Sequence, residues 1–213
     1  MNKFVKDFTQ ISAKDVQIAG GKAASLGEMT KLKISVPPGF VVLASAFDTF
    51  LADTEIGLKI DSILSEVRYE HMSAVEDASK KIRRLIARAP FPSDQSQEIY
   101  AAFSKLDAKY VAVRSSATAE DSSDASWAGE LESYLNTTKN RLLGNIKQCW
   151  SSLFTPRAIF YRYEKKLHRT KVSVAVAVQE MIQSEVSGIC FTVHPLTHAS
   201  RWQFSARGYS CQI

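Results

Sequence analysis

The sequence predicts an α+β fold in which helices dominate the first half and strands appear mainly in the second. Apolar residues recur at helical spacing through most of residues 1–109, and Gly- or Pro-marked turns separate these stretches. From residue 110 onward, short β-prone runs alternate with helical segments. We therefore expect a mainly helical N-terminal lobe at 1–109 and a mixed α/β lobe at 110–198.

The first lobe contains one expected strand between helices. Residues 26–32 carry apolar side chains at helical spacing after the Gly20-Gly21 pair, which predicts a short helix that opens at a glycine turn. The proline-marked run 36–42 is apolar and β-prone and predicts a strand. Further helical stripes follow at 47–51, 56–67, 75–86 and 99–106.

The second lobe alternates strands and helices. Its β-prone runs are 110–114, 132–136, 172–178 and 188–193, and we expect the last two to form a hairpin. Residues 142–153 have helical spacing, and Thr155-Pro156 supplies an N-cap and a first helical proline for the next helix.

Composition favours an ordinary globular protein. The 213 residues are 45% hydrophobic and 23% charged, with no apolar signal core at the start and no run of about 18 uncharged apolar residues, so we expect a cytoplasmic protein without a membrane span. Three widely spaced cysteines fit neither a disulfide framework nor a zinc site, and Cys149 and Cys190 are expected to be core thiols.

The charge balance is basic. Lys and Arg exceed Asp and Glu by 27 to 22, which gives a formal net charge of +5. This excess would suit an anionic ligand such as a nucleotide, but charge alone favours a solvated basic surface. Nucleic-acid binding has little support, because the basic residues lie in helical patterns without aromatic residues between them.

The segment from Gly20 to Met29 is the first candidate site. Two glycines let the backbone approach an anion at a helix start, where amide N–H groups and the helix dipole favour phosphate, and Lys22 adds a positive charge. The alternative is a glycine turn beside a surface lysine. The segment is not a Walker A motif.

The second candidate lies in residues 111–136. A strand there delivers Arg114 into a run of small residues, Ser115 to Thr118, whose amides and hydroxyls are available to phosphate oxygens, and a guanidinium can grip two such oxygens at once. The alternative is an acidic loop in which Arg114 pairs with Glu120 or Asp121.

These segments, in this order, closely resemble the ATP-grasp modules of phosphoenolpyruvate synthase, pyruvate phosphate dikinase and rifampicin phosphotransferase. The resemblance covers roughly residues 7–198. It runs through GGKAASLGEM at 20–29, VPPGF at 36–40, VAVRSSATAEDSSDASWAGELESYLN at 111–136, SSLFTPRAIFYR at 151–162, VQEMI at 178–182 and SGICFTVHPLT at 187–197.

The resemblance implies a nucleotide site. Lys22 and Arg114 would contact the ATP phosphates, and Gly129 and Ser133 would line the nucleotide. Gln179 is expected to contact the adenine or the ribose, and Met181 offers either an apolar surface to the base or a core side chain. Within the loop, Glu130 stands where glutamine is commoner, so a carboxylate there must point away from phosphates or meet a cation.

The resemblance ends at about residue 199. In the family, Mg2+ ligands follow the strand that matches 187–193, whereas the tail at 199–213 contains no Asp or Glu. We therefore expect an ATP-grasp module truncated in its second half, with no metal ligands and no catalytic residue in this chain. The four histidines, His71, His168, His194 and His198, lack the family's phosphohistidine context.

The resemblance implies the N-terminal ATP-binding part of an enzyme that phosphorylates an internal histidine and then pyruvate. Its partners would be ATP, with Mg2+ in the complete enzyme, and the phosphohistidine and pyruvate-binding domains of the parent protein. This chain alone is expected to be inactive. The alternatives are a non-catalytic nucleotide-binding fragment and the ATP module of a rifampicin phosphotransferase-like enzyme.

Overall fold

The structure is a computed structural model that describes residues 3–118, 132–166, 173–191 and 204–208, the last range and 187–191 by backbone alone. The chain forms two compact units, residues 1–181 and residues 182–213. Helices and strands both contribute to the first unit, as the α+β prediction requires.

An antiparallel sheet of five strands forms the centre of the first unit. The strands are β1 Val5–Asp7, β2 Gly39–Val42, β3 Val111–Ala117, β4 Ser133–Thr137 and β5 Val174–Glu180. Their order is β1-β2-β5-β3-β4, so β5, the last in sequence, lies between β2 and β3. The lobes expected at 1–109 and 110–198 thus contribute strands to the same sheet.

Seven described helices pack on this sheet or on one another, together with three short 3-10 turns. The helices are α1 Val16–Lys31, α2 Ala44–Asp53, α3 Ile56–Ser65, α4 Met72–Arg88, α5 Ser93–Leu106, α6 Lys139–Ser151 and α7 Pro156–Glu164, and the turns are η1 Phe8–Gln10, η2 Ala13–Asp15 and η3 Ser152–Phe154. Each predicted helix is present. Two of the described strands were not predicted, namely β1 and the strand β7 Phe204–Gly208.

The start of α7 shows how local sequence sets a helix boundary. The Thr155 side chain accepts a hydrogen bond from the Ala158 backbone N–H at 3.1 Å, and Pro156 occupies the first helical position. Proline has no N–H to leave unpaired there, and its fixed φ suits a helix. The predicted cap is confirmed.

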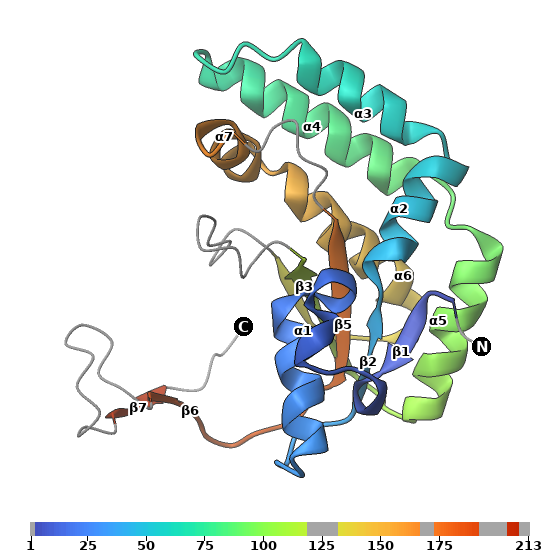
Figure 1. The fold of residues 1–213 in the computed structure, drawn as a ribbon, viewed down its shortest axis with the longest axis vertical. Coiled ribbons are helices and arrows are strands. Elements are labelled where there is room, and N and C mark those ends of the chain that lie inside the picture. Colours follow the sequence, from blue (N-terminus) through green and yellow to red (C-terminus); the bar gives the residue numbers. More distant parts are fainter. Residues whose placement is uncertain (1–2, 119–131, 167–172, 192–203, 209–213) are drawn as a thin grey trace. The chain divides into compact units, whose positions relative to one another are not determined.

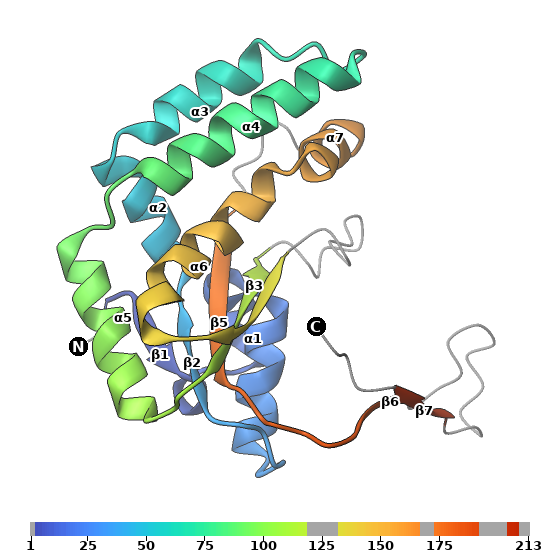
Figure 2. The ribbon, with the colours of Figure 1, turned by 180° about the vertical axis from the view of Figure 1, so that it is seen from behind.

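The two faces of the sheet carry different cores. Valines at alternate positions of β3 and β5 point into a large core with the helices α2, α4 and α6, centred on the fully buried Trp150. The opposite face is lined by small residues, including Ala175 and Ala177, and packs against Ala19 and Ala23 of α1. Figures 1 and 2 show α1 on one side of the sheet and α6 on the other. Small side chains let α1 approach this face closely.

The second unit contains a two-stranded antiparallel sheet. Strand β6 Ser187–Phe191 pairs with β7 Phe204–Gly208, with Ile189 opposite Ala206. The hairpin expected between 172–178 and 188–193 is therefore wrong. Strand β5 has both its edges occupied by β2 and β3, which leaves no edge for β6.

Candidate nucleotide-binding site

The glycine segment interrupts α1. Gly20 has φ 75° and ψ 163°, which breaks the helical backbone at that residue. This combination is essentially restricted to glycine. The helix restarts immediately afterwards, with Lys22 exposed and Ala23 buried against the sheet. The predicted helix opening at a glycine turn is thus present, and a further helical turn precedes it.

Strand β3 presents the second candidate segment to the same face. Val111 and Val113 are buried in the large core, so the alternating residues Arg114 and Ser116 lie on the face that α1 covers. Arg114 is exposed and Ser116 is fully buried.

The two segments are in direct contact. A Cβ atom built on Gly20 would lie 2.3 Å from both the backbone oxygen and Oγ of Ser116. The Ala23 backbone N–H donates to Ser116 Oγ at 3.2 Å. The structure therefore brings together the two segments that carry Lys22 and Arg114, although they lie about ninety residues apart.

Ser133 lies beside Arg114. In the β3–β4 pair, Ser133 is directly opposite Arg114, and directly opposite residues of antiparallel strands project from the same face. Ser133 is exposed. Gly129 lies outside the described residues, as do Glu120 and Asp121, the alternative partners of Arg114.

Gln179 lies on the same face, farther along the sheet. It is opposite Ala112 in the β3–β5 pair and is 8% exposed. Its side-chain Nε2 donates to the backbone oxygen of Pro37 at 3.2 Å. Met181 donates its backbone N–H to the oxygen of Tyr110 at 3.0 Å. This end of β5 is therefore tied to the loop before β2 and to the start of β3.

Hydroxyls in the small-residue run are engaged within the protein. Ser115 Oγ donates to the Glu132 backbone oxygen at 2.7 Å, and Thr118 Oγ1 donates to the Ser173 oxygen at 2.9 Å. The expectation that these hydroxyls are available to phosphate is wrong for Ser115 and Thr118. Their bonds fix both ends of the polypeptide that joins β3 to β4.

Glu132 is a residue that sequence reasoning missed. Its carboxylate pairs with Arg83 Nη2 of α4 at 3.0 Å and accepts a hydrogen bond from the Tyr134 hydroxyl. Burial and this bond raise the pKa of Tyr134 well above its usual value. The cluster anchors the start of β4 to α4. The pattern of charges in the sequence could not reveal this ion pair, because Arg83 lies 49 residues away from Glu132.

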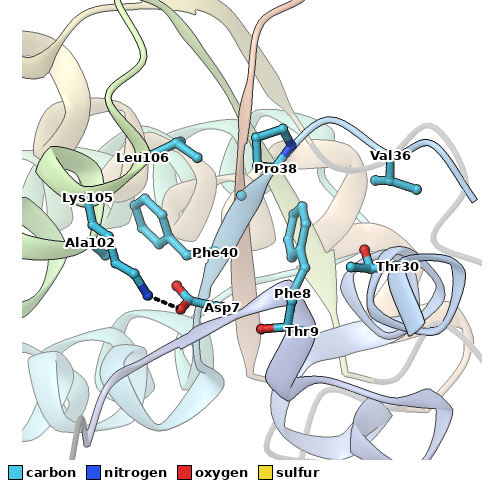
Figure 3. Close-up of a pocket in the computed structure, with 11 residues that line it drawn as sticks. Asp7, Phe8, Thr9, Thr30, Val36, Pro38, Phe40, Ala102, Lys105 and Leu106 are labelled. Carbon is cyan, nitrogen blue, oxygen red and sulfur yellow. Dashed lines mark hydrogen bonds and ion pairs between the residues drawn. The ribbon is translucent and has the colours of Figure 1, made fainter. Parts of the chain in front are cut away.

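A pocket of about 340 Å3 lies near the loop before β2. Figure 3 shows Phe8, Pro38 and Phe40 around it, with the ion pair between Lys105 Nζ and Asp7 Oδ2 at 2.6 Å. One lining residue, Gly39, is opposite Gln179. The pocket thus borders the Gln179 end of the site. Arg114 does not line it, and β5 lies between β2 and the strand that carries Arg114.

A second hollow, of about 400 Å3, lies beside the restarted helix. Gly21, Ser25 and Glu28 are among its lining residues.

In the described part of the chain, no group of three or more His, Cys, Asp or Glu side chains could hold a metal ion. Across the same residues, no helix is long and apolar enough to cross a membrane.

Comparison with known proteins identifies the family. The family described as pyruvate phosphate dikinase, AMP/ATP-binding domain, matches residues 16–207. The match continues for nine residues beyond 198 and takes in β6 and most of β7.

Curated relatives agree with this match. A probable phosphoenolpyruvate synthase of Methanocaldococcus jannaschii is 45% identical over 202 residues, covering 92% of this chain and 17% of the relative. One of Archaeoglobus fulgidus is 45% identical over 193 residues, covering 88% of this chain and 26% of the relative. The phosphoenolpyruvate synthase of Pyrococcus furiosus is 35% identical over 235 residues, covering 92% of this chain and 29% of the relative.

The chain thus spans less than a third of the length of each of these relatives. The family match covers most of the chain, including the glycine segment and the strand that carries Arg114. The resemblance seen in the motifs is confirmed, and the chain belongs to the pyruvate phosphate dikinase AMP/ATP-binding domain family.

Proposed function

We propose that this chain is the N-terminal ATP-binding part of a phosphoenolpyruvate synthase-like dikinase, built as an ATP-grasp module. The observation that carries the proposal is the packing of Gly20 and Ala23 on Ser116. That packing puts the start of a helix, with Lys22, next to the strand that bears Arg114. The family match and the relatives support the same assignment.

The proposed site binds ATP at both ends of the nucleotide. Lys22 and Arg114 hold the triphosphate, because an ammonium and a guanidinium each attract phosphate oxygens and the guanidinium can bond two at once. Ser133, opposite Arg114, adds a hydroxyl. Gly129, which lies outside the described residues, is proposed to line the nucleotide on the basis of the family resemblance. Gln179, at the far end of the same face, contacts the adenine or ribose and keeps its bond to Pro37.

In the parent protein, ATP phosphorylates an internal histidine, and the phosphoryl group then passes to pyruvate. Water takes up the second phosphoryl group that ATP loses, so AMP and inorganic phosphate are the other products. The histidine and the pyruvate site belong to further domains, so this chain supplies nucleotide binding and is inactive alone. Mg2+ in the complete enzyme takes its ligands from outside the described residues.

Two alternative proposals retain the ATP module but assign it to a different kind of protein. The chain is then either a non-catalytic nucleotide-binding fragment or the module of a rifampicin phosphotransferase-like enzyme, since the acceptor is chosen by other domains. The genomic sequence beyond codon 198 separates them. A GLGE-like run followed by a TSHA-like histidine supports the dikinase, and an early stop supports the fragment.

Nucleotide titration tests the proposal directly. Calorimetry or NMR titration of the chain should show ATP binding in the high micromolar range or weaker, and tighter than AMP, because ATP offers more phosphate oxygens to Lys22 and Arg114. Incubation with labelled ATP should leave every histidine unlabelled. No ATP binding at about 10 mM would contradict nucleotide binding, and acid-labile label on a histidine would contradict the inactive-chain proposal.

A further inference from the structure

The restart of α1 after Gly20 lacks a cap of its own. A helix leaves its first backbone N–H groups without partners inside the helix, and a side chain at the N-cap position usually accepts from the second or third of them. Gly20 occupies the N-cap position of the restarted segment, and glycine has no side chain to do this.

Ser116 takes over this function from β3. Its Oγ accepts from the backbone N–H of Ala23, the third residue after Gly20, at 3.2 Å. This is the amide that an N-cap side chain would bond. Ser116 is fully buried, and its bond crosses 93 residues of sequence. The cap therefore also ties the helix to the sheet.

The Gly20 contact fixes the same junction from the other side. Because a Cβ atom at this position would lie only 2.3 Å from the Ser116 backbone oxygen, there is no room for any side chain, and the φ of 75° excludes most residues as well. The close approach and the hydrogen bond act on one strand residue. Together they set both the distance and the rotation of the helix relative to β3.

We propose that Ser116 is a positioning residue that sets Lys22 relative to Arg114 so that both can hold one polyphosphate. Lys22 is the residue before Ala23, and Arg114 is two residues before Ser116 on the same face of β3. One hydrogen bond thus links the two segments that carry the cations. The inference rests on the proposed ATP site and adds a residue that touches no nucleotide.

Ser116→Ala in this chain is the test, and Ser79→Ala is its matched control. Ser79 is also a buried serine with a backbone bond, from its Oγ to the Phe154 oxygen at 2.6 Å, but it lies on α4 in the other core. We expect Ser116→Ala to weaken ATP binding about five- to tenfold while AMP, with one phosphate, changes less than twofold. Ser79→Ala should leave both affinities within twofold. Ser116→Cys, which is slightly larger than serine and accepts hydrogen bonds weakly, serves if the alanine variant does not fold.

Hydrogen exchange at the Ala23 amide provides a readout that needs no nucleotide. Exchange of the Ala23 amide should accelerate in Ser116→Ala. It should not accelerate in Ser79→Ala when the two variants are compared under conditions that give them the same free energy of unfolding. Equal losses of ATP and AMP affinity, or an unchanged ATP affinity, would overturn the positioning role. If the unsubstituted chain binds no ATP, the proposed function fails. Unchanged hydrogen exchange at the Ala23 amide in Ser116→Ala would separately overturn the proposed capping bond.

Discussion

Replacing Gly20 with alanine should destabilise the first unit strongly. The residue has φ 75° and ψ 163°, a combination that costs an ordinary residue of order 1–3 kcal/mol. The added methyl would also lie 2.3 Å from the Ser116 backbone oxygen, so α1 and β3 must separate. Separation breaks the Ala23–Ser116 bond, which contributes about 1 kcal/mol. The free energy of unfolding should therefore fall by about 2–4 kcal/mol.

Gly144 provides the control, because it is an exposed residue of α6 where an added Cβ atom would have nothing within 4 Å. Gly144→Ala should raise the free energy of unfolding by about 0.5–1 kcal/mol, since alanine favours a helix interior. Urea unfolding followed by circular dichroism measures both. A Gly20→Ala variant within about 0.5 kcal/mol of the parent would refute the reasoning from backbone strain and close packing.

Three further predictions concern the core and titrating groups. Phe50→Ala should cost about 3–5 kcal/mol in urea unfolding, because Phe50 is fully buried among aromatic rings, while Leu58→Ala, at 80% exposure, should stay within about 0.5 kcal/mol. The Ser12 hydroxyl bond lowers the pKa of Asp15 below its usual 3.8, so the carboxylate adds stability above that value and loses it as pH falls through the lower folded pKa. The stability difference between the parent and Asp15→Asn should close as pH falls from about 5 to about 2, and a constant difference would contradict this. Burial raises the pKa of the Cys149 thiol, so a thiol reagent at about pH 8 should modify Cys149 only after unfolding, as peptide mass spectrometry would detect.

Local sequence signals predicted most elements of the fold. Thr155-Pro156 marked the start of α7, and valine alternation marked β5, because each signal lies within the element it specifies. Local signals did not predict the order of the strands in the sheet. Alternation indicates which residues share a face of a strand, but it does not indicate which strands are neighbours. The placement of β5 between β2 and β3 was therefore missed. Strand β1 has three residues, too few for a periodic signal.

The candidate site shows the same limit. The glycine pair and Arg114 were found from residue type and spacing, and the structure brings their segments together. The contact that joins them depends on Ser116, a residue whose role appears only when α1 packs on β3. Gln179 was chosen through the family resemblance. Its bond to Pro37 links residues 142 positions apart, which no local pattern could indicate.

Removal of the two proposed phosphate cations tests the central claim most directly. ATP titration of Lys22→Met and Arg114→Met should show affinities at least about tenfold below the parent, a loss of about 1.4 kcal/mol for each cation. Lys80→Met and Arg84→Met, at exposed positions of α4, make the same changes of charge and should leave ATP affinity within twofold. Melting temperatures near that of the parent should accompany all four variants, because exposed cations contribute little to stability. ATP affinity within twofold of the parent in both Lys22→Met and Arg114→Met would contradict the account.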